Sequence, residues 1–236
     1  MVSKTKTAYV CNDCGADYRK WQGQCSECNA WNTLSEVRLG SPARAGKVLR
    51  PGFAGAVDSA VKTLADIALD EIPRISSGAG ELDLVLGGGF VPGSCVLLGG
   101  EPGAGKSTVL LQTLCAMAES NSALYVTGEE SPQQVAMRAN RLGLPTEKLE
   151  IMAETSVETV CAIAEQKRPK ILVVDSIQVM HIDEVASAPG SVSQVRESAA
   201  MLVRFAKQTG TVLILVGHVT KDGSLAGPKV LEHMID

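Results

Sequence analysis

Residues 100–108 have the composition and spacing of a loop that binds phosphates. They read GEPGAGKST and match the pattern G-x-x-x-x-G-K-[ST]. Glycines let backbone N–H groups approach phosphate oxygens, and a helix that begins within the loop adds the positive end of its dipole. The lysine would contact the β and γ phosphates, and the serine hydroxyl would coordinate Mg²⁺. The segment therefore predicts a nucleoside triphosphate site made by Gly100, Glu101, Pro102, Gly103, Ala104, Gly105, Lys106, Ser107 and Thr108.

An aspartate and a histidine follow two other apolar runs of the kind expected for buried strands. Asp175 comes directly after ILVV at 171–174, where a Walker B carboxylate would hold Mg²⁺, usually through bound water. A role in a turn or a helix cap is the alternative for this aspartate. His218 follows VLILVG at 212–217 and is a candidate sensor of the γ-phosphate, with a purely structural histidine as the competing interpretation.

Two adjacent glutamates, Glu129 and Glu130, follow the run ALYVTG at 123–128. Ligands of open α/β sheets lie beyond the carboxyl ends of the strands, so a glutamate at this position can polarise an attacking water. We assign that role to Glu129, with Glu130 as its substitute. Solvated surface acidity is the alternative for both.

Four cysteines occur as two C-x2-C pairs separated by ten residues. Each pair can place two thiolates on one tight turn, and two such turns supply tetrahedral ligands for Zn²⁺. A segment this small cannot bury enough apolar surface to fold alone, so a metal would supply folding free energy. An iron centre with the same ligands, or four free thiols, are the alternatives. The predicted zinc ligands are Cys11, Cys14, Cys25 and Cys28, whereas Cys95, Cys115 and Cys161 are predicted to be small core residues.

Short apolar runs alternate with longer helix-compatible stretches from about residue 64 onward. Apolar runs without polar alternation predict strands buried on both faces, as in a parallel sheet covered by helices. Ser131 and Pro132 read as the cap and first position of one helix. The pattern predicts an α/β fold with strands at 95–99, 123–127, 171–174 and 212–216 and helices at 106–120, 132–142, 156–167 and 191–208.

The composition divides the chain into two modules. Residues 1–50 hold eight Lys and Arg against four Asp and Glu, whereas the remainder holds fourteen against twenty-two. The acidic remainder argues against a basic nucleic-acid surface over the whole molecule. Residues 38–60 are rich in Gly, Ala, Ser and Pro and read as a linker. We therefore predict a zinc ribbon at 1–35, a linker at 36–63 and an ATPase core at 64–236.

The distribution of apolar residues indicates in which cellular compartment the protein is expected. The chain is 45% apolar, which is enough for a packed core, but it lacks an apolar run near the roughly 20 residues that a membrane-spanning helix needs. The first residues also lack the apolar stretch of a secretory signal. We expect a cytoplasmic protein with no membrane partner, in which thiols stay reduced.

Taken together, these segments resemble the RadA (Sms) family of bacterial DNA-repair ATPases. The resemblance covers nearly the whole chain, in the blocks CNDCGADYRKWQGQCSECNAWNT, GGGFVPGSCVLLGGEPGAGKST, YVTGEES, ILVVDSIQVMH and VGHVTKDGSLAGPKVLEHMID. It implies a RecA/DnaB-like ATPase core with a mostly parallel sheet, a zinc ribbon, and ATP, Mg²⁺ and Zn²⁺ as cofactors. By the same resemblance, Asp175 is the Walker B carboxylate and Glu129 activates the water.

The resemblance also implies an activity. Family members use ATP to drive branch migration of recombination intermediates, as a homo-hexameric ring that is threaded by single-stranded DNA and assists a RecA-type recombinase. The family's Lys-Asn-Arg-Phe-Gly motif and Lon-protease-like domain would lie beyond residue 236, so we expect this chain to be a fragment whose own activity is open.

Two loops would face the DNA in such a ring, roughly 183–193 and 220–229. The second carries Lys221 and Lys229 among glycines, and six subunits would present about twelve such charges, enough for salt-dependent binding to a single strand. Neither loop contains an aromatic residue or an arginine, so sequence-indifferent binding is expected. Ordinary solvated loops are the alternative.

Other functions use the same motifs. A KaiC-like ATPase or autokinase shares the core and the GEES segment, although the four-cysteine ribbon does not favour it. A zinc-ribbon adaptor that keeps ATP as a structural ligand is a third possibility. A small-molecule kinase is disfavoured because no arginine-rich lid follows Asp175, and a GTPase is disfavoured because N-K-x-D is absent.

Overall fold

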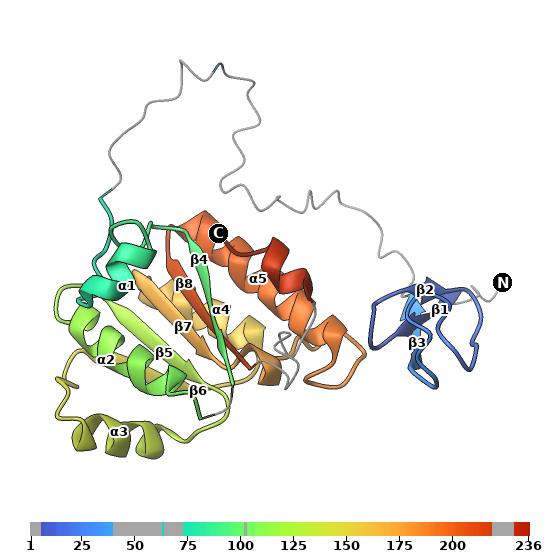
Figure 1. Cartoon of the computed structure of the whole chain (residues 1–236), viewed down its shortest axis with the longest axis horizontal. Helices are drawn as coiled ribbons and strands as arrows, with labels where there is room; N and C mark the ends of the chain where they lie inside the picture. The colour runs from blue at the N-terminus through green and yellow to red at the C-terminus, as the bar shows by residue number, and fades with distance from the viewer. Residues whose placement is uncertain (1–5, 40–62, 64–72, 102, 219–228) are drawn as a thin grey trace.

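A small antiparallel sheet forms from the N-terminal residues of the chain (Figure 1). The computed structural model describes residues 6–39, 63, 73–101, 103–218 and 229–236. The sheet has the order β2-β1-β3, from β1 (Lys6–Cys11), β2 (Asp17–Tyr18) and β3 (Leu34–Leu39). Its described core consists of only Cys11, Cys25 and Leu34, with three further side chains packed against them. So small an apolar core leaves most of the folding free energy to come from a metal.

The second part of the chain is built on five parallel strands in the order β4-β8-β7-β5-β6. The predicted RecA-like α/β fold is confirmed, with every strand of this sheet parallel. The strands are β4 (Cys95–Gly100), β5 (Ala123–Thr127), β6 (Leu149–Ala153), β7 (Ile171–Asp175) and β8 (Val212–His218). The helices are α1 (Gly80–Val85), α2 (Lys106–Ala118), α3 (Pro132–Arg141), α4 (Val157–Lys167) and α5 (Val192–Thr209), with 3₁₀ turns η2 (Ile177–Val179) and η3 (Lys229–His233).

Helices cover both faces of this sheet, which is why its central strands read as continuous apolar runs. In β7, Ile171 and Val173 belong to the cluster that includes α2 and α3, whereas Leu172 and Val174 belong to the cluster that includes α4 and α5 (Figure 1). All five residues of β7 are buried. Each fully buried aliphatic side chain stabilises the fold by about 1.5–3 kcal/mol.

Local signals place the start of α3 as predicted. The Ser131 hydroxyl accepts a hydrogen bond from the Gln134 N–H, and the Gln134 side chain accepts one from the Ser131 N–H at 2.8 Å. Pro132 occupies the first helical position, where its missing N–H costs nothing. The capping box therefore fixes how the chain leaves β5 and passes Glu129.

The structure also differs from the sequence expectations. The strand β6 and the helix α1 were not predicted, and β3 continues to Leu39, past the expected end of the ribbon. Cys95 and Cys115 are fully buried, as predicted, and Cys161 on α4 is partly buried and packs against the core cluster. Residues 40–62 of the predicted linker lie outside the described residues. In the described ranges, every helix is too short or too polar to cross a bilayer.

Candidate nucleotide and zinc sites

The residues predicted to handle ATP gather at one edge of the core sheet. Parallel register places Gly100 of β4 opposite His218 of β8, and Thr127 of β5 opposite Asp175 of β7. Since β8 lies between β4 and β7, the phosphate loop and Asp175 leave strands that are not neighbours, with His218 between them. This edge is formed by the carboxyl ends of the strands, where open α/β sheets bind their ligands.

The phosphate loop joins β4 to α2 in the geometry that its glycines predict. Gly103 and Gly105 have φ of 82° and 83°, in the left-handed region that favours glycine, and Gly105 is the N-terminal cap of α2. The Lys106 ammonium donates hydrogen bonds to the carbonyl oxygens of Gly100 at 2.6 Å and Glu101 at 2.8 Å. Ser107 and Thr108 lie in the first turn of α2, and Pro102 lies outside the described residues.

Asp175 is buried at the end of β7 and bonded to a tyrosine of the next strand. Its Oδ2 accepts a hydrogen bond from the Tyr125 hydroxyl at 2.6 Å. Burial first, and then the nearby carboxylate, raise the pKa of Tyr125 above its ordinary range, so the phenol remains a donor. The hydrogen bond from Tyr125 therefore fixes the orientation of the carboxylate that is assigned to Mg²⁺. The peptide bond that follows, between Asp175 and Ser176, is cis.

Glu129 reaches two groups of the same edge. Its carboxylate accepts a hydrogen bond from the Ser176 hydroxyl, and the His218 Nε2 lies 3.2 Å and 3.4 Å from its two oxygens. The His218 Nδ1 is buried with no hydrogen-bond partner among the described residues. An Nε2–H tautomer, which this arrangement requires, donates to Glu129. The structure thus brings together Glu129 and His218, which are 89 residues apart.

Among the described residues, Glu130 forms an ion pair with a side chain of α3 and does not contact the partners of Glu129. Both of its carboxylate oxygens contact the Arg138 guanidinium on α3, whose side chain is 15% exposed. Its backbone also pairs with the Thr127 hydroxyl, which donates to the Glu130 carbonyl at 2.7 Å. Glu130 is committed to holding α3 against β5, and this geometry favours Glu129 as the water-activating residue.

The Lys106→Ala variant should lose most of its ATP affinity. Removing one charged partner from hydrogen-bonded phosphates costs about 2–5 kcal/mol, which corresponds to an affinity loss of about thirtyfold or more. Titration of a fluorescent ATP analogue measures the change. Lys167→Ala is the matched control, because Lys167 pairs with Glu150 on the surface and faces no phosphate site. Unaltered ATP affinity in Lys106→Ala would refute the assignment of this loop.

The four cysteines of the ribbon converge as a metal site requires. Their Sγ atoms all lie within 4.8 Å of one another. The Cys11 and Cys28 sulfurs are 3.7 Å apart, and those of Cys14 and Cys25 are 3.4 Å apart. A tetrahedral zinc with Zn–S bonds of about 2.3 Å separates its sulfurs by about 3.8 Å. The arrangement therefore fits Zn²⁺ held by four thiolates.

The two C-x2-C turns have the same backbone design. The N–H of Gly15 donates to the Cys11 carbonyl and that of Asn29 to the Cys25 carbonyl, each at 2.9 Å. Both residues take positive φ, 77° for Gly15 and 58° for Asn29. Glycine and asparagine are the residues that adopt this conformation most readily. The local sequence thus favours both turns.

Hydroxyl groups contact one sulfur from each pair. The Tyr18 hydroxyl lies 3.2 Å from the Cys25 Sγ, and the Thr33 hydroxyl lies 3.2 Å from the Cys11 Sγ. The bond from Tyr18 is the largest of the effects that lower the pKa of Cys25, to about 6. A thiolate is the form that binds metal, so these hydroxyls favour the ligating state.

Comparison with known proteins gives two matches to family models and many close relatives. Residues 74–224 match the AAA domain, and residues 9–36 match the rubredoxin metal binding domain. The whole chain is 63% identical to the DNA repair protein RadA of Escherichia coli (strain K12), 61% to that of Haemophilus influenzae and 44% to that of Bacillus subtilis. The chain belongs to the RadA family. It spans about half the length of these relatives, 52%, 52% and 51%.

RadA-family membership confirms the resemblance seen in the sequence, and the two matched domains support binding of ATP and zinc. Sequence reasoning missed several residues of these sites: Tyr18, Thr33, Tyr125, Arg138 and Ser176. Their partners are mostly distant in sequence, up to 50 residues for Tyr125 and Asp175. Only the position of Ser176, directly after Asp175, offered a local signal.

The predicted DNA loops are only partly within the described residues. The first, 183–193, is described and leads into α5. Lys221 lies outside the described residues, and Lys229 begins η3 with its side chain not described. The assignment of these lysines to DNA remains a prediction.

Proposed function

We propose that this chain is the ATP-hydrolysing part of a DNA-dependent ATPase of recombinational repair, which drives branch migration as a ring-shaped motor. The observation that carries the proposal is the convergence of the phosphate loop, Asp175, Glu129 and His218 at one edge of a RecA-like sheet. Membership in a family of DNA repair proteins supplies the process in which such an ATPase works.

In this proposal the loop binds the phosphates and Glu129 prepares the water. Lys106 exchanges its two carbonyl partners for the β and γ phosphate oxygens, since its ammonium already lies across the loop. Glu129 orients the attacking water and accepts its proton. The His218 Nε2 donates to Glu129, and a γ-phosphate oxygen would compete for that same donor. This competition makes His218 a sensor of the γ-phosphate.

The chain also offers oxygen ligands of the kind that Mg²⁺ prefers. The Ser107 hydroxyl begins α2 and the Asp175 carboxylate ends β7, at the same edge of the sheet. When bound with ATP, Mg²⁺ would neutralise charge on the β and γ phosphates. Tyr125 keeps Asp175 in place for this contact.

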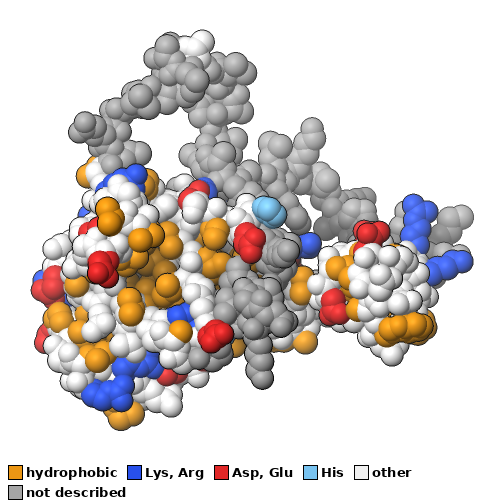
Figure 2. Space-filling model, in the orientation of Figure 1, with side chains coloured by type: hydrophobic (Ala, Val, Ile, Leu, Met, Phe, Trp, Pro, Cys, Tyr) orange, Lys and Arg blue, Asp and Glu red, His pale blue; other side chains and the backbone are white. Residues whose placement is uncertain are grey.

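The partners of the proposed motor are single-stranded DNA, recombination intermediates and a RecA-type recombinase, with assembly into a homo-hexamer in the full-length protein. Gly103, Ala104 and Gly105 of the phosphate loop are exposed, which leaves room for a neighbouring subunit beside the loop. The ribbon exposes Trp21 (58%) and Trp31 (69%), and its surface in Figure 2 carries an area of hydrophobic side chains. Exposed apolar areas of this kind support contact with a partner.

Measuring ATP turnover with and without single-stranded DNA tests the proposal in the full-length protein and in this chain. Stimulation by DNA supports the motor. Turnover indifferent to DNA supports a KaiC-like ATPase, and tight binding without turnover supports an adaptor that keeps ATP as a structural ligand. A branch-migration assay on a recombination intermediate then tests the motor activity directly.

Reversing the charges of Lys221 and Lys229 in the full-length protein should weaken DNA binding for all sequences alike. Loss of phosphate contacts also lowers the dependence of the binding constant on salt, by nearly one unit of log–log slope per contact in duplex DNA and about 0.7 in single strands. Fluorescence anisotropy with labelled oligonucleotides at several salt concentrations measures both quantities. If affinity and salt slope both stayed unchanged, these lysines would not lie on the DNA path.

A further inference from the structure

One buried side chain organises the loop that follows η2. Gln194, in the first turn of α5, is 3% exposed. Its Oε1 accepts a hydrogen bond from the Ile182 N–H at 2.9 Å. Its Nε2 donates to the carbonyl oxygens of Ile182, Val185 and Ser187, at 3.2, 3.0 and 3.0 Å. The amide of Gln194 therefore replaces water as the partner of this loop's backbone.

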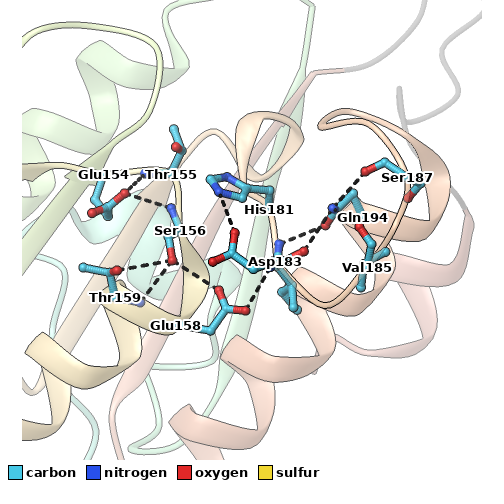
Figure 3. Close-up of polar contacts among 11 residues, drawn as sticks. Glu154, Thr155, Ser156, Glu158, Thr159, His181, Asp183, Val185, Ser187 and Gln194 are labelled. Atoms are coloured by element: carbon cyan, nitrogen blue, oxygen red, sulfur yellow. Dashed lines mark hydrogen bonds and ion pairs between the residues drawn. The ribbon is translucent and has the colours of Figure 1, made fainter. Parts of the chain in front are cut away.

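The same loop is also attached to α4 (Figure 3). The Asp183 N–H donates to Glu158 Oε1 at 3.1 Å, and the Ser156 hydroxyl donates to Glu158 Oε2 at 3.2 Å. The His181 imidazole lies 3.6 Å from the Asp183 carboxylate. Figure 3 shows these groups between the ends of the two helices, with Gln194 on the far side of the loop. Loop 182–191 is thus held from two sides, by Gln194 of α5 and by Glu158 of α4.

The segment that enters this loop begins at the nucleotide site. Residues 176–181, the connecting segment, start at Ser176, which bonds Glu129, and include η2. Ile177 and Met180 of this segment are fully buried. A Cβ atom on Gly128, the residue before Glu129, would overlap Val179 Cγ2. The close packing at Gly128 and the hydrogen bond from Ser176 therefore link the chain around Glu129 to the connecting segment.

We propose that Gln194 is a positioning residue that couples the nucleotide site to loop 182–191. Its hydrogen bonds fix the loop to the first turn of α5, beginning at Ile182, the residue that directly follows the connecting segment. A shift that travels from Ser176 along this segment then reaches a loop of fixed shape, and is not lost in a flexible chain. The inference rests on the proposed function, because loop 182–191 overlaps the predicted loop at 183–193 that would face DNA in the proposed ring. Nucleotide binding would then change the conformation of the loop backbone. A DNA strand bound to the loop would in turn change the position that Glu129 prefers.

A purely structural role for Gln194 predicts a different outcome from a coupling role. A structural residue lowers stability and affects all activities together. A coupling residue leaves ATP binding and basal turnover in place but removes the response of each site to the other. Measurements of ligand dependence, rather than of activity alone, separate the two.

The test compares Gln194→Met with the matched control Gln166→Met, an exposed glutamine on α4, in the full-length protein. Three quantities are measured for each variant. They are the basal rate of ATP turnover, the rate at saturating oligo-dT, and the hydrogen exchange of residues 182–191 with and without a non-hydrolysable ATP analogue. We expect Gln194→Met to keep its basal rate, to lose DNA stimulation by about tenfold, and to lose the nucleotide-dependent change in exchange. The control should keep all three.

Full DNA stimulation together with an unchanged nucleotide response of loop 182–191 would overturn the proposal. If Gln194→Met itself lowers the affinity for ATP, the Gln194→Asn variant replaces it, because asparagine keeps the amide but shortens its reach. The same two measurements, DNA stimulation and the nucleotide response of the loop, then decide the outcome. If the unmodified protein shows no DNA stimulation, the proposed function fails. The hydrogen-exchange measurement then still decides whether Gln194 links the nucleotide site to the loop.

Discussion

Replacing Glu129 with glutamine is expected to leave ATP binding nearly intact and to slow hydrolysis by about a hundred- to ten-thousand-fold. The amide keeps the size of the side chain and can still contact the Ser176 hydroxyl and His218 Nε2. It cannot accept the proton of the attacking water, so binding geometry survives while the base is lost. Single-turnover hydrolysis and an ATP titration measure the two effects separately.

The neighbouring Glu130→Gln variant is the matched control. Its carboxylate is paired with Arg138, so the change should loosen α3 slightly and leave the hydrolysis step near its unmodified rate. A normal rate in Glu129→Gln together with a slow rate in Glu130→Gln would transfer the catalytic role to Glu130. The His218→Ala variant tests the sensor role on its own. It should lower the affinity for ATP, which carries the γ-phosphate, more than the affinity for ADP.

Loss of one zinc ligand should unfold the ribbon and spare the ATPase core. In Cys28→Ser, a four-thiolate site becomes incomplete, and structural zinc contributes about 10–16 kcal/mol of apparent binding free energy to folding domains of this size. The described apolar core of the ribbon, Cys11, Cys25 and Leu34, is far too small to offset that loss. NMR of the ribbon amides and an ATP titration on the same sample measure the two parts.

A graded series makes this prediction sharper. Tyr18→Phe keeps all four ligands but removes the hydroxyl that contacts Cys25, so zinc affinity should fall by about ten- to a hundredfold without unfolding the loaded ribbon. Metal analysis of the unmodified protein should find one zinc per chain. A ribbon that keeps its NMR spectrum after chelation, or intact thiols with well under one zinc per chain, would contradict the metal assignment.

Residue type and spacing determined the chemistry of both sites. The phosphate loop and the two C-x2-C pairs act within short segments, where glycines and asparagine at positive φ form the turns by local preference alone. The buried strands were predictable for a related reason, since β5, β7 and β8 are covered on both faces and therefore carry unbroken apolar runs. The edge strand β6 was missed because it is largely exposed and its sequence, LEIMA, carries no such run.

Only the tertiary structure decided which side chains act together. The sequence offered Glu129 for the catalytic role with Glu130 as its substitute, and the contacts of Glu130 with Arg138 on α3 and of Glu129 with His218 on β8 support the first choice. The insertion of β8 between β4 and β7 places His218 against a glutamate 89 residues earlier in the chain. The proposed role of Gln194 likewise depends on the tertiary structure, which places the loop after η2 within hydrogen-bond distance of its side chain. Strand order and helix packing bring such partners together, and both are set by burial of the whole sheet, which a short segment of sequence does not encode.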